Sequence, residues 1–232
     1  NGLSIYTYGE KRFPEKKKTE YGFNIDKHNI GILRVESFSV PVKPYHAFID
    51  SVFQVLQNKK IEDLIIDIRD NDGGDIVHGY LILDYLATQP MKFASKLYLK
   101  TSELTKEKYK DPDQAELSPL QAEYWPYDNK EYNDLLMNSA NGAINEISLR
   151  KYIPDPDTFK FKGTVHVLTN GLVFSSSFPL AYMIKDYGLA TIVGEETGIV
   201  SPAYGEPLRY TLPHTQISIM NSTCSIIRPS GV

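Results

Sequence analysis

The chain has 232 residues, of which 41% are hydrophobic, and its 25 Lys and Arg against 29 Asp and Glu give a formal net charge of −4. This length suffices for one sizeable core, and an acidic balance without a basic block argues against a protein that binds nucleic acid. A single cysteine, Cys224, excludes an intrachain disulfide and a cysteine-rich zinc site, and no apolar run approaches the roughly 18 residues of a membrane span.

The clear patterns begin about thirty residues into the chain. Residues 1–28 are predicted as an N-terminal strand or linker segment, with a solvated turn at the lysines 16–18. Residues 30–38 are apolar and rich in β-formers, so they predict a buried strand that Pro41 and Pro44 end. Apolar residues at helical spacing from Tyr45 to Leu56 then predict an amphipathic helix.

The next stretch combines a buried strand with a buried helix. Residues 64–68 form a continuous apolar run, which is typical of a strand covered on both faces. After a glycine-containing turn, residues 76–86 are apolar nearly all round, which indicates a buried helix. Residues 101–132 are charged and contain the only tryptophan, Trp125, so we expect a surface excursion that packs on the core through its aromatic residues. Residues 133–152 are predicted to be helical.

The last third of the chain repeats the strand and helix pattern. A strand at 165–169, a helix at 180–185 and a strand at 191–193 are expected, and a hairpin around Pro213 and His214 closes the chain. This order predicts an α/β domain with a largely parallel sheet, flanking helices and a C-terminal hairpin. The predicted core domain spans residues 29–232 and carries an insertion at about 101–155.

Two strand-to-helix turns are candidate sites, because ligand sites of α/β sheets form beyond the carboxyl ends of strands. In the first, Gly73 and Gly74 allow the backbone to approach a ligand and to point N–H groups at it. A tight turn without a ligand is the alternative. A calcium loop is disfavoured, because Asp75 stands where such a loop needs glycine and Leu81 where it needs glutamate.

The second turn contains Ser175, Ser176 and Ser177. A serine at a helix N-terminus is usually an N-cap, and we predict that role for Ser177. The same place suits a nucleophile, because the helix dipole and free N–H groups stabilise a developing negative charge.

Both turns resemble segments of the C-terminal processing peptidases, also called tail-specific proteases, whose family includes tricorn-like members. Residues 64–74, LIIDIRDNDGG, resemble a strand with the family's Asp-x-Arg-x-Asn-x-Gly-Gly signature, and residues 167–177 resemble its nucleophile turn. Residues 185–198 resemble the segment that follows that turn, and residues 209–213 with 228–229 fit its closing hairpin. The resemblance implies a crotonase-like (ClpP-like) fold, serine peptidase activity on peptide or unfolded protein substrates, no cofactor, and an exported protein.

The resemblance also assigns roles to individual residues. Ser175 is the expected nucleophile, and the oxyanion hole is expected from the N–H of Ser176 together with that of Gly73 or Gly74. Bacterial tail-specific members use a Ser–Lys dyad, but no lysine follows Lys185 here. The tricorn-like branch, which uses a histidine base and an acidic partner, is therefore the implied one.

The base itself is not evident among the five histidines. His78 is nearest in sequence to the glycine turn and is one candidate. The others are expected on a strand face, at the hairpin tip or at the surface: His166, His214, His28 and His46. We expect the base to precede Asn1, which would make this chain the catalytic core of a larger protein.

The same residues leave two alternative functions open. The chain could be a non-catalytic ligand- or peptide-binding module, or an acyl-CoA enzyme of the crotonase type with a different site. If it is a peptidase, Ser175 should lie close to the turn of Gly73 and Gly74. Arg69 should pair with a carboxylate and help to hold that turn.

Overall fold

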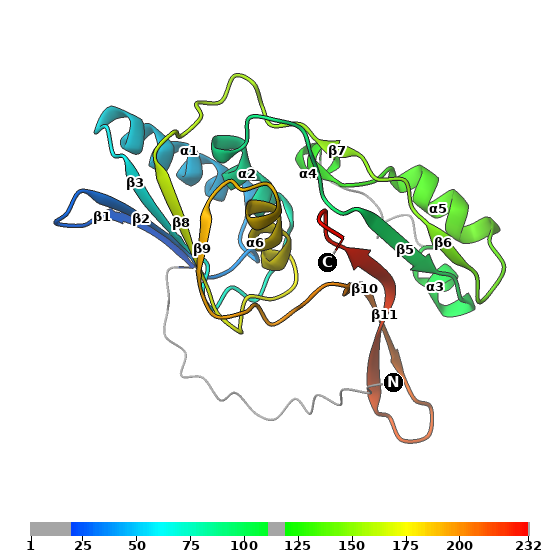
Figure 1. Ribbon diagram of the computed structural model, residues 1–232. Helices are drawn as coiled ribbons and strands as arrows, with labels where there is room; N and C mark the ends of the chain where they lie inside the picture. The colour runs from blue at the N-terminus through cyan, green and yellow to red at the C-terminus, as the bar shows by residue number, and fades with distance from the viewer. Residues whose placement is uncertain (1–19, 111–118, 232) are drawn as a thin grey trace.

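The computed structural model describes residues 20–110 and 119–231, and its central feature is a largely parallel sheet (Figure 1). Among the described residues the strand order is β1-β2-β3-β8-β9, in which β1 runs antiparallel to β2 and the other pairs are parallel. The strands are β1 (Tyr21–Ile25), β2 (Ile30–Val35), β3 (Asp63–Asp67), β8 (Thr164–Thr169) and β9 (Thr191–Gly194). The predicted α/β class with a largely parallel sheet is confirmed.

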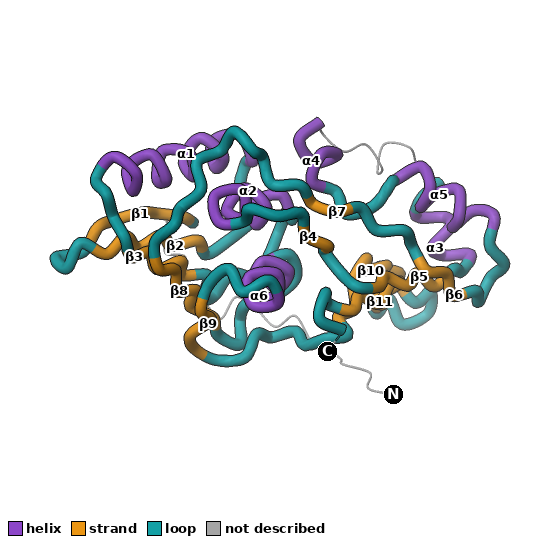
Figure 2. Tube along the Cα trace, turned by 45° about the horizontal axis from the view of Figure 1, so that its top comes forward, coloured by secondary structure: helices purple, strands orange, loops and turns teal. Residues whose placement is uncertain are grey.

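The helices that connect these strands lie on one side of the sheet, as Figure 2 shows. They are α1 (Val42–Asn58), α2 (Val77–Leu86) and α6 (Ser177–Asp186). Each lies between successive parallel strands that are added in one direction, and right-handed crossovers then place every helix on the same face. All ten residues of α2 are buried, because this helix packs between α1 and α6 over the sheet. No helix in the described ranges has the length and apolar character that crossing a membrane requires.

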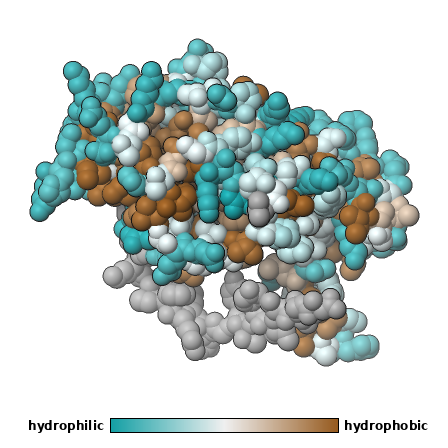
Figure 3. Space-filling view, in the orientation of Figure 1, coloured by the Kyte–Doolittle hydropathy of each residue, from teal (hydrophilic) through white to brown (hydrophobic). Residues whose placement is uncertain are grey.

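The two faces of the sheet are therefore unlike. On the face that the helices cover, Leu33, Ile66 and Val167 lie in register and are fully buried in the main core. Ile32, Ile65 and Leu168 point to the opposite face, where they are only partly buried, and within the described ranges they lie outside this core. In the left half of Figure 3, where Figure 1 places these strands, apolar residues gather into a patch.

A second, antiparallel sheet has the strand order β10-β11-β5-β6. It consists of β10 (Ala203–Thr211), β11 (Ser218–Ile227), β5 (Lys96–Lys100) and β6 (Ile144–Glu146), and a separate pair joins β4 (Met91–Lys92) to β7 (Lys151–Tyr152). The predicted C-terminal hairpin is β10 with β11, and its tip projects from the body in Figure 1. A smaller core lies beneath this sheet: Leu97, Leu99, Tyr127, Tyr132, Leu136, Ile147 and Cys224.

Residues 101–155, predicted as an insertion, contain α3 (Glu103–Lys108), α4 (Pro119–Tyr124) and α5 (Asn129–Asn138). Aromatic residues attach this region to the main core, as expected. The Tyr124 hydroxyl donates to Asp84 of α2 at 2.6 Å, and Tyr152 donates to the same carboxylate. The Tyr124 ring also stacks on Tyr80 of α2, with ring centroids 5.7 Å apart.

Several predicted boundaries were wrong for local reasons. The helix expected over 133–152 ends at Asn138, because a turn at Gly142 with φ +88° leads into the strands β6 and β7. The strand expected over 30–38 stops at Val35, and Phe38 forms only an isolated bridge to Gly74. Pro44 lies in the first turn of α1, where a missing N–H is tolerated. The turn predicted at residues 16–18 lies outside the described residues.

The unequal faces lead to a stability prediction. Ile66→Ala removes a fully buried side chain beneath the helices, so we expect the free energy of unfolding to fall by about 2–5 kcal/mol. Ile65→Ala, one residue earlier on the open face, should cost about 1 kcal/mol. Urea denaturation followed by circular dichroism measures both, and equal losses would contradict the one-sided core.

Candidate active site

The serine turn has an unusual backbone. Ser175 has φ +53°, in the left-handed region that non-glycine residues rarely adopt. It follows β8 and precedes α6, and its side chain is exposed. A strained, exposed serine at a helix N-terminus is a functional candidate on geometry alone.

The glycine turn lies directly against the serine turn, as predicted. Gly73 has φ +100°, and a Cβ atom at this position would lie 2.6 Å from Cβ of Ser175. The hydroxyl of Ser176 donates to the backbone oxygen of Gly74. The two turns meet because β3 and β8 are neighbours in the sheet, which brings their carboxyl ends together.

Asn71 joins these turns, and the sequence interpretation assigned it no role. Its side chain is fully buried: Nδ2 donates to the carbonyl oxygen of Val35 at 3.1 Å, and Oδ1 accepts the Gly73 N–H at 3.0 Å. Its own backbone oxygen accepts the N–H of Phe174 at 3.0 Å. The only advance signal was its place in the motif, two residues before the paired glycines.

The role predicted for Ser177 was wrong. The N-cap position of α6 is Ser176, which makes no side-chain capping bond. Ser177 is fully buried, and its hydroxyl donates to the backbone oxygen of Asn71 at 2.7 Å while accepting the Phe174 N–H at 3.0 Å. It therefore ties the two turns together instead of capping the helix.

The candidate oxyanion donors differ in availability. The Gly73 residue is buried and its N–H is bound to Asn71, whereas Gly74 is exposed. For residues 20–110 and 119–231 we find no hydrogen-bond acceptor for the N–H groups of Gly74 and Ser176. Of the two glycines named as alternatives, Gly74 is therefore the one whose N–H has no acceptor in the described ranges, and its part in an oxyanion hole stays a prediction.

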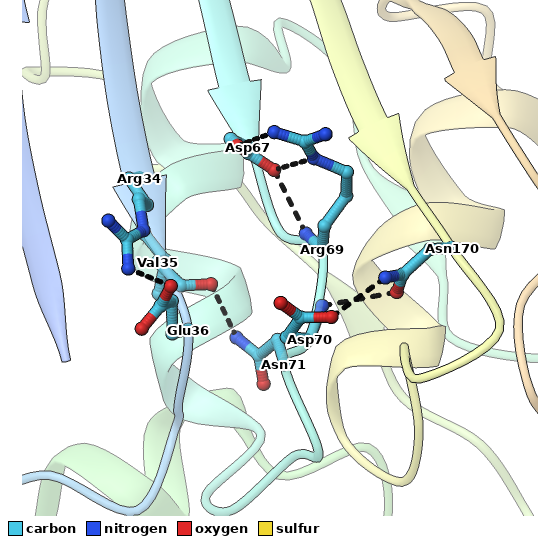
Figure 4. Close-up of polar contacts among 8 residues, drawn as sticks. All are labelled: Arg34, Val35, Glu36, Asp67, Arg69, Asp70, Asn71 and Asn170. Carbon is cyan, nitrogen blue, oxygen red and sulfur yellow. Dashed lines mark hydrogen bonds and ion pairs between the residues drawn. The ribbon is translucent and has the colours of Figure 1, made fainter. Parts of the chain in front are cut away.

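Polar residues at the ends of β2, β3 and β8 surround a pocket of about 290 Å³ (Figure 4). Asn170 donates from Nδ2 to Asp70 at 2.8 Å and accepts the Asp70 N–H at 3.1 Å, which forms a second tie between the turns. The pocket is lined by Arg34, Glu36, Asp67, Arg69, Asp70 and Asn170.

Arg69 pairs with a carboxylate, as expected. It donates from Nη2 and Nε to Asp67 at 2.7 Å and 2.9 Å. Burial alone raises the pKa of Asp67, but the hydrogen bonds from Arg69 outweigh it, and this pKa lies below its ordinary value. The bonds of Arg69 are made to Asp67 at the end of β3, whereas Asn71 and Asn170 make the bonds that link the glycine turn to β2 and to the turn after β8. That Arg69 helps to hold the turn stays a prediction.

His78 lies inside the core, where it faces backbone oxygens and not the serine. Its Nδ1 and Nε2 atoms lie 3.1 Å and 3.0 Å from the carbonyl oxygens of Asp75 and Val40. Its ring stacks on Phe38 and packs against Tyr45. Burial lowers its pKa below the ordinary 6.5, against the opposing effect of Asp75 and the two carbonyls. These contacts suit a packing residue and do not suit the proposed base.

The remaining histidines lie elsewhere. His28 and His214 are exposed, His46 lies beside Asp50 on α1, and His166 lies on β8. For the part of the chain that the structure describes, we find no histidine or lysine bonded to Ser175. Nor do three His, Cys, Asp or Glu side chains converge there as a metal site requires.

Comparison with known proteins identifies the family. The profile of peptidase family S41 matches residues 29–201. The chain belongs to this family. It is a family of serine peptidases, which agrees with the resemblance in the two turns.

Solved structures share the fold at low identity. A Parabacteroides merdae peptidase is 20% identical with a TM-score of 0.61, over 91% of this chain and 53% of its own. Mature CPAF in complex with lactacystin is 20% identical with a TM-score of 0.63, over 91% and 47%. An S41 protease from Bacteroides fragilis is 14% identical with a TM-score of 0.50, over 91% and 46%. The chain thus spans about half the length of these structures, and no curated protein matches it.

The buried position of His78 predicts a pH-dependent stability. Unfolded His78 takes up a proton near pH 6.5, whereas the folded state keeps it neutral to lower pH. The unfolded state therefore binds more protons below pH 6.5, and the free energy of unfolding falls as pH is lowered toward the folded pKa. Urea denaturation between about pH 7.5 and pH 5 measures this decline. His78→Gln should reduce it and the exposed His28→Gln should not; the same slope in His78→Gln would contradict this placement.

The buried amide of Asn71 predicts a large loss on its removal. Asn71→Ala leaves the Gly73 N–H and the Val35 carbonyl unsatisfied, so we expect the free energy of unfolding to fall by about 2–4 kcal/mol. Asp72→Ala, at the exposed neighbouring position, should change it by less than about 0.5 kcal/mol. Urea denaturation at neutral pH compares the two, and a loss in Asn71→Ala as small as in the control would show that the turn does not depend on the amide.

Proposed function

We propose that this chain is the catalytic core of a serine endopeptidase, with Ser175 as the nucleophile. The observation that carries the proposal is the contact between the two turns: an exposed, left-handed Ser175 lies against Gly73, and the N–H groups of Gly74 and Ser176 have no acceptor among the described residues. Membership of peptidase family S41 supports the same reaction class. The substrates are peptides or unfolded proteins.

In this mechanism the Ser175 hydroxyl oxygen attacks a peptide carbonyl carbon and forms a tetrahedral intermediate. The negative oxygen of that intermediate needs donors near it, and the N–H groups of Ser176 and Gly74 supply them. The N-terminus of α6 adds a favourable partial positive charge. Collapse of the intermediate releases the amine and leaves an acyl-enzyme that water hydrolyses.

The proton of Ser175 needs a base, and we propose that this base comes from a segment outside the described residues. The contacts of His78 and the absence of lysine after Lys185 support this choice. A histidine base with an acidic partner would place the chain in the tricorn-like branch. Without its base, a serine triad keeps only the roughly 10³–10⁴-fold acceleration that the oxyanion hole and binding provide.

A peptide-binding module of the same fold is the second candidate function. It is favoured by the lack of a base beside Ser175 in the described residues. Such a module would hold a peptide at the same two turns without cutting it.

Cleavage of a labelled, unfolded protein tests the proposal. We expect slow turnover by the 232-residue chain and robust turnover by a longer protein that extends before Asn1. Ser175→Ala should abolish the robust turnover, a loss of at least about 10³-fold, because it removes the nucleophile. Ser218→Ala, at an exposed serine of the hairpin, is the matched control and should retain full activity.

The outcomes separate the two candidate functions. Robust, Ser175-dependent cleavage by the 232-residue chain alone would show that the base lies within it. Failure of both proteins to cleave in a Ser175-dependent way would favour the binding module.

A further inference from the structure

The dipeptide Asn-Gly occurs twice in the described part of the chain, as Asn141-Gly142 and as Asn170-Gly171. This dipeptide is chemically labile, because the backbone nitrogen after the asparagine can attack the side-chain amide carbon and close a succinimide ring. Glycine favours the attack, since it has no Cβ atom to obstruct the approach. The second pair follows β8 in the turn that carries Ser175, so a reaction there would alter the candidate site.

Three hydrogen bonds hold the side chain of Asn170, and the two that join it to Asp70 are drawn in Figure 4. Oδ1 accepts the N–H groups of Asp70 and Leu172, each at 3.1 Å, and Nδ2 donates to the Asp70 carboxylate at 2.8 Å. The bond from Leu172, two residues ahead, folds the side chain back over the intervening Gly171 amide. The amide carbon of Asn170 is therefore restricted to the neighbourhood of the nitrogen that would attack it.

The two N–H groups on Oδ1 also favour the attack electronically. When a nitrogen adds to Cγ of Asn170, negative charge develops on Oδ1, where these donors already lie. Donors placed in advance where charge develops lower the barrier to such a reaction. Gly171 is exposed, and between residues 20 and 110 or 119 and 231 we find no acceptor for its N–H. Its proton is therefore accessible to solvent hydroxide.

The other Asn-Gly pair has the opposite features. The Gly142 N–H donates to the backbone oxygen of Thr101 at 2.8 Å, which retains the proton that must leave before the attack. The Nδ2 atom of Asn141 donates to Glu103 at 3.2 Å, and within the described ranges no N–H donates to its Oδ1 atom. The same dipeptide thus lies once in a reactive setting and once in a protected one.

We propose that Asn170 is a site of self-modification, at which the following glycine converts the asparagine to aspartate or isoaspartate. The Gly171 nitrogen gives its proton to hydroxide and bonds to Cγ of Asn170. The bond from Cγ to Nδ2 then breaks, and Nδ2 leaves as ammonia with a proton from water. A second water opens the succinimide at either carbonyl, so the net change takes up one water and releases one ammonia. No atom of Ser175 takes part, so this inference does not depend on the proposed function.

The products lose the bond that ties the serine turn to the glycine turn. The amide nitrogen of Asn170 lies 2.8 Å from the Asp70 carboxylate, so an aspartate at this position sets one carboxylate against another. A hydrogen bond to a charged group is then replaced by repulsion. Isoaspartate also inserts a methylene group into the backbone ahead of Ser175. The serine turn therefore loosens as the molecule ages, which limits the time for which the site stays assembled.

Peptide mapping of the aged protein tests the proposal. The 232-residue chain is kept at mildly alkaline pH and physiological temperature, digested with trypsin at mildly acidic pH, and analysed by mass spectrometry. We expect Asn170 to convert at least about tenfold faster than Asn141, because its amide is positioned and its oxygen is supplied with donors. Equal rates, or faster conversion of Asn141, would overturn the proposal.

Gly171→Ala tests whether the glycine is the attacking group. An added Cβ atom at Gly171 meets no heavy atom within 4 Å, and the backbone there is not left-handed, so the variant should fold. It should slow the conversion of Asn170 at least about tenfold by obstructing the attack, and leave the rate at Asn141 unchanged. Circular dichroism checks the fold, and a folded variant that converts Asn170 at the original rate would refute the attack by residue 171.

An exchange of charge tests the consequence for the turn. Asn170→Asp, which reproduces one product, should lower the melting temperature by about 2–6 °C. Adding Asp70→Asn restores an amide beside a carboxylate with the roles exchanged, and asparagine tolerates the left-handed φ of +65° at this position. The double variant should recover most of the loss. An unchanged melting temperature in Asn170→Asp, or no recovery in the double variant, would contradict the loosening of the turn.

Discussion

The candidate site depends on the buried amide of Asn71. Its side chain donates to the carbonyl oxygen of Val35 at the end of β2 and accepts the N–H of Gly73. Its backbone oxygen accepts two hydrogen bonds from the turn after β8, one from the Phe174 N–H and one from the Ser177 hydroxyl. A buried amide is stable only when its donors and acceptors are all satisfied, which leaves few arrangements of the three strand ends. Asn71 thereby engages the N–H of Gly73, whereas the N–H of Gly74 has no acceptor in the part of the chain that the structure describes.

Steric fit completes what these hydrogen bonds begin. A Cβ atom on Gly74 would lie 2.1 Å from the carbonyl carbon of Phe38, and one on Gly73 would overlap Ser175, so both positions require glycine. Ser175, whose backbone is in the left-handed region, occupies the space into which a side chain at position 73 would project. The one-sided placement of α1, α2 and α6 leaves the opposite face of the sheet without any of these three helices.

The sequence predicted those parts of the protein that local pattern determines. The apolar run of β3, the all-round apolar α2, the hairpin and the proximity of Ser175 to the glycine turn follow from periodicity, glycine placement and parallel-sheet geometry. The wrong or missing roles belong to residues whose partners are distant in sequence. Ser177 looks like a cap when only its own helix is considered, and its true partner, Asn71, is 106 residues away. The open face of the sheet was also missed, because an apolar run does not reveal whether one face or two are covered.

The two turns are far apart in the sequence, and this separation determines when the site can form during synthesis and folding. Asn170 and Asp70 are 100 residues apart and Ser176 and Gly74 102, and α2, β5 and the region 101–155 lie between them. Closing so long a loop carries an entropic cost that is recovered only when β3 and β8 pair. A chain still on the ribosome that has not yet reached residue 175 lacks the serine, although its glycine turn has already been made. A nascent or partly unfolded copy therefore has no assembled nucleophile, even where other unfolded chains surround it.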